Sequence, residues 1–260
     1  MFSVLGEVFR RRELLGILVS RNLKIRYKSS ALGFFWSLIV PIFLIVIYAV
    51  FLKVMKFAIP LEILVVGVIV WQFFAMCLGD SLHAIVGNAN LVSKSAFPRL
   101  ILPTSMVLAN LINFLLSCIV LLVYLLIDGA DFGNLAWIPI VVVSQVALCL
   151  GLSLLFSASN VFFRDTEHVE SMIMLAWFFM TPVIYPIGLV MDNAAFPDWI
   201  KAAFFVNPMT GIVTGYRMAL LSFENPGNAF MCLSLVMCWL ILLVGFVVFQ
   251  KVEGLFADAL

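Results

Sequence analysis

Side chains that could do chemistry are few in this chain, and their densest group is the sequence RDTEHVE at residues 164–170. It holds three carboxylates and His168, while the second histidine, His83, lies far away along the chain. An enzyme that processes lipids or lipid-linked sugars in a membrane needs an acid, a base, a nucleophile or metal ligands in register. Only residues 164–170 approach such a set. We therefore expect no catalytic residue and no metal, and a polytopic lipid-processing enzyme is the less favoured alternative.

The cysteines and glycines offer no further chemistry. No cysteine pair has metal-binding or redox spacing, and in or beside apolar segments these thiols pack as small hydrophobic groups. The chain also lacks the Gly-rich loop ending in Lys-Ser or Lys-Thr that holds ATP phosphates, so it does not hydrolyse ATP by that route and needs no cofactor of its own. The five cysteines are Cys77, Cys118, Cys149, Cys232 and Cys238.

Six long runs without a charged residue define the framework around these groups. A helix needs about 20 apolar residues to cross the roughly 30 Å of bilayer hydrocarbon, and each run reaches or approaches that length. A soluble fold would have to bury all six in a chain with 65% hydrophobic and 11% charged residues. We predict an all-α polytopic membrane protein with six spans at residues 31–52, 63–79, 100–127, 132–163, 171–191 and 226–250.

The distribution of basic residues predicts the orientation. Seven of the fifteen Lys and Arg side chains fall before residue 31, which places this end in the cytoplasm by the positive-inside bias. Alternating six spans from there gives eleven basic residues inside against four outside, with Arg217 among the four, and puts both termini in the cytoplasm. We divide the chain into an N-terminal interface helix, residues 1–30, and a membrane domain, residues 31–260.

The N-terminal segment has the pattern of an imperfect amphipathic helix over residues 7–28. Leu14, Leu18 and Ile25 share one face by helical spacing, and Arg10 and Arg21 lie close to it. Long basic side chains can lie along apolar surface and keep their charge in water. An in-plane interfacial helix is therefore the preferred interpretation, with a basic tail that only sets topology as the alternative.

The segment between the second and third predicted spans, residues 79–103, is too long for a tight turn. Asn favours helix caps, and the residue before a proline resists helical angles. These signals predict a short helix that begins near Asn88 or Asn90 and ends before Pro98. Such a rigid element could dock a partner, and a solvated loop is the alternative.

The segment between the fifth and sixth spans, residues 191–227, is unusually apolar for a loop and is interrupted at Asn207 and Pro208. Asn followed by Pro is typical of a helix start. Each half is too short to span the bilayer, so we predict two short re-entrant helices. Backbone that leaves a helix at membrane depth must be covered by protein or line a wet cavity, which points to a gate at the outer mouth of a pathway. One predicted face of the second helix is Ile212, Val213, Tyr216, Ala219 and Leu220.

These segments together resemble the permease subunits of type 2 ATP-binding cassette polysaccharide exporters, which move O-antigen, capsular polysaccharide or teichoic acid. The resemblance covers almost the whole chain in order. It rests on RNLKIRYKSSALGFFWSLIVP (21–41), NANLVSKSAFPRLILP (88–103), NVFFRDTEH (160–168), FFMTPVIYP (178–186) and the Asn207 to Pro208 break.

The resemblance implies a homodimer of six-span permeases with two separate cytoplasmic ATPase subunits, which bind ATP and Mg²⁺. It also implies that the segment between spans two and three is the coupling helix, which passes the movement of the ATPase to the membrane domain. The coupling residues would be Asn88, Asn90, Leu91, Val92, Ser93 and Lys94, with Phe97 at the exit.

Two further roles follow as expectations. Arg164 and Asp165 would form an ionic latch with the N-terminal basic helix or the ATPase, or would be ordinary helix-end charges. Flat aromatic rings can stack on the C–H faces of sugars, so an aromatic conduit would let a glycan slide through. Its predicted residues are Trp36, Trp177, Phe178 and Tyr185; lipid-facing or interfacial aromatics are the alternative.

The predicted function is export of a lipid-linked polysaccharide, O-antigen in the first place, across the bacterial inner membrane, with membrane lipid around the protein and no nucleic acid as partner. A permease of the same architecture for a small drug or lipid is the main alternative.

Overall fold

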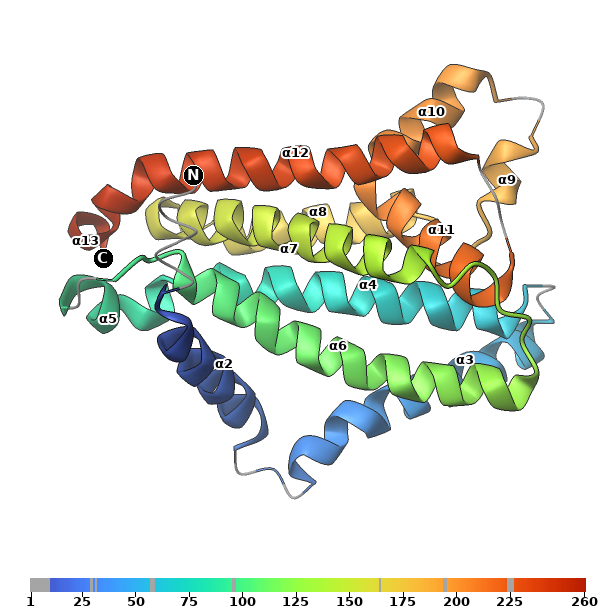
Figure 1. Cartoon of the computed structure of the whole chain (residues 1–260), viewed down its shortest axis with the longest axis horizontal. Coiled ribbons are helices and arrows are strands. Elements are labelled where there is room, and N and C mark those ends of the chain that lie inside the picture. Colours follow the sequence, from blue (N-terminus) through green and yellow to red (C-terminus); the bar gives the residue numbers. More distant parts are fainter. Residues whose placement is uncertain are drawn as a thin grey trace.

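The computed structural model describes residues 10–28, 30, 32–56, 59–94, 97–163, 165–193, 196–223 and 227–260, and these residues form helices and connecting turns without a strand (Figure 1). The all-α prediction is confirmed. The helices are α2 (Arg12–Tyr27), α3 (Trp36–Met55), α4 (Leu61–Leu82), α5 (Ala89–Lys94), α6 (Ile101–Asp128), α7 (Trp137–Phe162), α8 (Thr166–Met180), α9 (Gly188–Met191), α10 (Asp198–Val206), α11 (Pro208–Leu221), α12 (Asn228–Val252) and α13 (Phe256–Ala259), with 3-10 turns at Gly33–Phe35, Val86–Asn88 and Glu253–Leu255.

Five helices are long and apolar enough to cross a membrane: α3, α4, α6, α7 and α12. The predicted fifth span, residues 171–191, is divided. Helix α8 ends at Met180, and Thr181, which precedes Pro182, has extended angles (φ −106°, ψ 140°) because a residue before proline avoids the helical region. Residues 181–187 form turns before α9. The number of spans and the re-entry of the short helices stay predictions.

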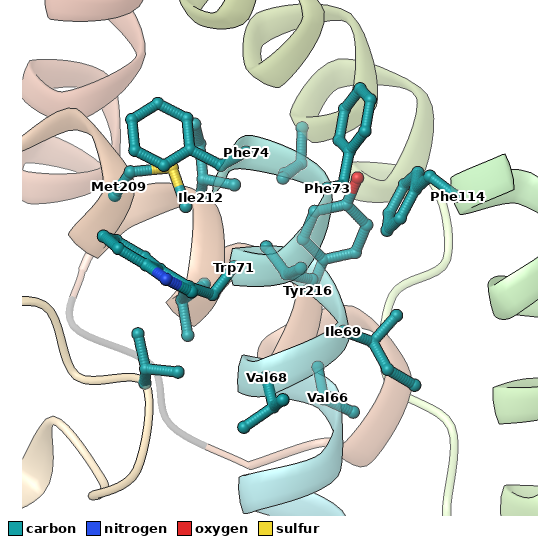
Figure 2. Packing of buried hydrophobic residues seen from close by; sticks show 14 of the residues in the cluster. Val66, Val68, Ile69, Trp71, Phe73, Phe74, Phe114, Met209, Ile212 and Tyr216 are labelled. Carbon is teal, nitrogen blue, oxygen red and sulfur yellow. The ribbon is translucent and has the colours of Figure 1, made fainter. Parts of the chain in front are cut away.

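Helix α4 lies at the centre of the bundle, and most of its side chains are buried. Trp71 and Phe74 meet edge to face at 5.3 Å between ring centroids, and Phe73 stacks on Phe114 of α6 at 4.7 Å (Figure 2). Tyr216 of α11 reaches the edge of the Phe114 ring at 6.0 Å. The aromatic side chains of α4 therefore join α6 and α11 into one core.

Helices α7 and α12 run side by side along the bundle (Figure 1). Two glycines, one on each helix, lie in close contact between them. A Cβ atom on Gly245 would lie 2.2 Å from the backbone oxygen of Gly151, closer than any side chain tolerates. Small residues allow such close backbone contact between helices in a membrane, where van der Waals packing holds helices together.

The short elements separate to the two ends of the bundle (Figure 1). Helices α5 and α13 and the C-terminus lie at one end, here called the α5 end. Helices α9 and α10 lie at the opposite end, here called the α10 end. The two ends of the bundle thus carry different short helices.

Gly245→Ala is predicted to destabilise the fold by about 1–3 kcal/mol, the usual cost of overpacking a tight contact. Gly79→Ala is the matched control, because Gly79 is also helical but a Cβ atom there meets no atom within 4 Å. Thermal unfolding of the two purified variants in detergent measures the difference. Equal midpoints for the two variants would contradict the glycine contact.

Candidate functional site

The segment predicted to couple to a partner is a short helix at the α5 end: the turn Val86–Asn88 leads into α5. The Asn88 amide donates to the backbone oxygen of Ala84 (2.8 Å) and accepts from the Arg21 guanidinium of α2 (2.8 Å). This side chain ties the segment to α2 and to the turn that follows α4. Of the two predicted helix starts, Asn88 directly precedes α5, whereas Asn90 lies inside the helix.

One side of this segment is packed and the other is open. Val92 is buried in a cluster with Leu18 of α2 and Phe256 of α13, and Phe97 packs against the same cluster. Leu91 is half-buried, and the side chain of Lys94 lies outside the described part of the chain. The exposed side chains, spaced as one helical face, are Val86, Asn90 and Ser93.

The C-terminal helix α13 packs against the segment, a role that the sequence reasoning missed. Phe256 is fully buried and meets the edge of Phe249 at 5.3 Å. The Arg99 guanidinium, just beyond the segment, donates to the backbone oxygen of Glu253. The sequence did contain a signal for this helix: the apolar pair Leu255 and Phe256 directly follows the last polar turn.

Helix α2 is held to the bundle by polar contacts as well as by Leu14 and Leu18. Ile25, predicted on the same apolar face, is 61% exposed, so it does not pack on the bundle, and this part of the helix meets α4 and α6 through polar groups. These contacts are the ion pair of Arg26 with Asp80 of α4, and hydrogen bonds to α6 from Asn22 to Ser105 (3.0 Å) and from Tyr27 to Asn113 (2.9 Å). The Asn110 amide of α6 also donates to Asp80 (2.7 Å). The in-plane interfacial position of α2 stays a prediction.

The predicted latch falls at the start of α8. Arg164 lies outside the described residues, and Asp165 is exposed and precedes the first helical residue. Nearby, His83 at the end of α4 lies 3.6 Å from the Glu167 carboxylate. The latch at Arg164 and Asp165 stays a prediction.

At the α10 end, Asn207 and Pro208 occupy the break between α10 and α11, as predicted. The side-chain oxygen of Asn207, Oδ1, accepts a hydrogen bond from the Met209 backbone N–H (3.0 Å), which caps α11. It also accepts from the Trp177 indole (2.7 Å). Its amide nitrogen donates to the Thr181 hydroxyl (2.9 Å). One side chain thus joins the end of α8 to the start of α11.

Arg217 of α11 points into the bundle and binds backbone oxygens near the end of α8. It was counted as a basic residue of an outer loop, but its side chain is fully buried. The guanidinium donates to the backbone oxygens of Ile63 (2.8 and 3.0 Å), Val183 (2.8 Å) and Tyr185 (3.0 Å). These bonds connect the first turn of α4 to the non-helical residues after α8. The sequence signal for this buried role was an arginine in the middle of an apolar segment.

The four predicted conduit residues do not meet on one surface of a single protomer. Trp177 and Phe178 pack on the α4 rings of Phe74 (5.2 Å) and Trp71 (5.4 Å). Tyr185 lies beyond the end of α8, where its hydroxyl donates to the Phe179 backbone oxygen (3.2 Å). Trp36 is partly exposed and lines a cavity on a different side of α4. The conduit stays a prediction.

Comparison with known proteins identifies the family of this chain. Residues 13–221 match the ABC-2 type transporter family. The chain is similar to an O-antigen export system permease protein RfbA of Myxococcus xanthus, with 34% identity over 92% of this chain and 94% of the relative. It is also similar to two proteins of that name from Klebsiella pneumoniae, with 30% and 32% identity over 98% of this chain and 97% of each relative. The chain is a membrane-spanning member of the ABC-2 type transporter family.

Proposed function

We propose that this chain is the permease subunit of an ATP-driven exporter that moves lipid-linked O-antigen across the bacterial inner membrane. The observation that carries the proposal is similarity over nearly the full length to three permeases named for O-antigen export. The chain acts as a homodimer with two cytoplasmic ATPase subunits, and both of its termini lie in the cytoplasm. The alternative of a drug or lipid exporter has no comparable support.

Deletion of the gene tests this function in its own cell. The expected result is loss of surface O-antigen while the lipid-linked glycan accumulates on the inner face of the membrane, because synthesis continues without export. Immunodetection of the glycan before and after permeabilisation measures both pools. Normal surface O-antigen in the deletion strain would contradict the proposal.

The exposed face of Val86, Asn90 and Ser93 is the proposed docking surface for the ATPase. The segment below it is tied to α2 by the bond from Arg21 to Asn88 and packed on α13 through Val92. A push on the exposed face would therefore move a firmly packed unit and would not be absorbed by a loose loop. The proposed latch at Arg164 and Asp165 would meet the ATPase beside this surface.

Val86→Asp combined with Asn90→Trp is predicted to abolish co-purification of the ATPase subunit and export. A carboxylate buried without a partner at an interface costs several kcal/mol, and the indole obstructs the contact. The control is Val86→Thr with Asn90→Ser, which keeps the size of the surface nearly unchanged. Full ATPase binding by the Asp/Trp variant, at normal permease abundance, would rule out this docking surface.

The α10 end is the proposed outer gate. The bond from Trp177 to Asn207 connects α8 to α11, so opening between these helices requires this contact to break. It is one of three hydrogen bonds between the Asn207 side chain and the end of α8, together with those to the Thr181 hydroxyl and the Met180 backbone oxygen. Such a bond contributes about 0.5–1.5 kcal/mol net, a strength that a transport cycle can overcome.

Trp177→Phe is predicted to loosen this gate and leave the fold intact. Phenylalanine keeps an aromatic ring against Phe74, and Asn207 still accepts from the Met209 N–H. Leakage of a small hydrophilic sugar analogue into intact cells should rise. Trp239→Phe, at an exposed site on α12, is the matched control, and equal leakage from both variants at equal abundance would contradict the gate.

A further inference from the structure

A cavity of 310 Å³ lies among α2, α3, α4 and α6, separate from the docking surface and the outer gate. Its volume is at the lower end of the roughly 300–1,000 Å³ of small-molecule sites. The lining is mostly aromatic and aliphatic, with a few polar groups that come from all four helices. Residues used below are Arg26, Trp36, Gln72, Phe73, Asn110 and Asn113.

Three buried polar atoms at this cavity have no hydrogen-bond partner among the described residues: Arg26 Nη1, Asn110 Oδ1 and Asn113 Nδ2. Asn110 is 2% exposed and Asn113 is 7% exposed. A buried polar atom left without a partner is costly. Three of them beside one cavity therefore indicate a site that a polar ligand completes.

The partners of these amides fix which atoms remain for a ligand. The Asn110 side-chain nitrogen donates a hydrogen bond to the Asp80 carboxylate (2.7 Å), and an ionised carboxylate can only accept. The side-chain oxygen of Asn110 is therefore the atom left over. Asn113 accepts at its oxygen from the Tyr27 hydroxyl (2.9 Å), which leaves its nitrogen. One acceptor and two donors are therefore left unmatched beside the cavity.

The charge of the site excludes an anion as the best ligand. The Arg26 guanidinium is paired with the Asp80 carboxylate, so the two formal charges cancel. A phosphate would satisfy the two donors, but its oxygens would leave Asn110 Oδ1 without a donor and would approach Asp80. Hydroxyl groups both donate and accept, so a neutral polyhydroxylated ligand satisfies all three atoms.

The walls favour a ring with flat apolar faces. Phe73 and Phe114 stack on each other with an interplanar angle of 16° and form a buried apolar wall (Figure 2), and Trp36, which is 43% exposed, lines the cavity from α3. Aromatic rings offer flat apolar surface, which suits the C–H faces of a pyranose. Gln72 adds a further amide on the α4 side.

We infer that this cavity binds one neutral sugar residue within each protomer. The inference rests on the proposed function for the source of the sugar, which would be a residue of the lipid-linked glycan. The site would hold the glycan beside α2 and α3, on the side of α4 away from Trp177 and Phe178.

Protection from thiol labelling tests the site without an export assay. Ser117, on the cavity wall, is replaced by cysteine in a cysteine-free chain purified in nanodiscs, and the rate of reaction with a small methanethiosulfonate is measured. Methyl glucoside at about ten times its Kd is expected to slow the reaction about tenfold. Glycerol phosphate at equal ionic strength is expected to give no protection.

Two variants identify the contacts. Gln72→Leu keeps the side-chain volume and should weaken protection while thermal stability and the unprotected labelling rate stay at parental values. Asn113→Ala removes the unmatched donor and also the acceptor of the Tyr27 hydroxyl, so it should weaken protection and lower thermal stability. A cysteine at the exposed position 232 is the control site and should label equally with and without sugar. Protection by glycerol phosphate alone, or by neither compound, would overturn the inference. Sugar protection in a chain that exports no glycan would contradict the proposed function and leave the site standing.

Discussion

Buried backbone groups need protein partners, and the fold depends on how this chain meets that requirement after α8. Residues 181–187 leave the helix, which frees backbone carbonyls inside the bundle. The Arg217 guanidinium binds those of Val183 and Tyr185 together with that of Ile63. A buried arginine is costly unless its donors are bonded. Its fully buried position therefore fixes α4, α11 and the irregular segment against one another.

The same requirement organises the opposite end around Asp80. This carboxylate lies in the last turn of α4 and receives Arg26 from α2 and the Asn110 amide from α6. Three helices are thereby held at one point, and Arg21 extends the connection to Asn88. The docking segment consequently belongs to a continuous packed unit. A movement of a partner at its exposed face would reach α4 and α6 through these contacts.

The sequence predicted those features that depend on local signals. Long uncharged runs predicted the five long helices, and Asn207 followed by Pro208 predicted the break before α11. It did not predict the pairing of Asp80 or the burial of Arg217, because their partners lie 30 to 154 residues away along the chain. The early end of α8 had a local signal in Pro182, but the uncharged run continued past it to residue 191. The cavity beside Asn110 could not be foreseen, since it depends on the packing of four helices.

The central claim is that this permease moves a glycan when a separate subunit hydrolyses ATP. The most direct measurement uses proteoliposomes that contain the purified chain, its ATPase subunit and a fluorescent lipid-linked O-antigen. The account predicts ATP-dependent transfer of the glycan to the opposite leaflet, measured as loss of access to an external glycosidase, only when both subunits are present. ATP-dependent transfer of a fluorescent phospholipid without transfer of the glycan would contradict it.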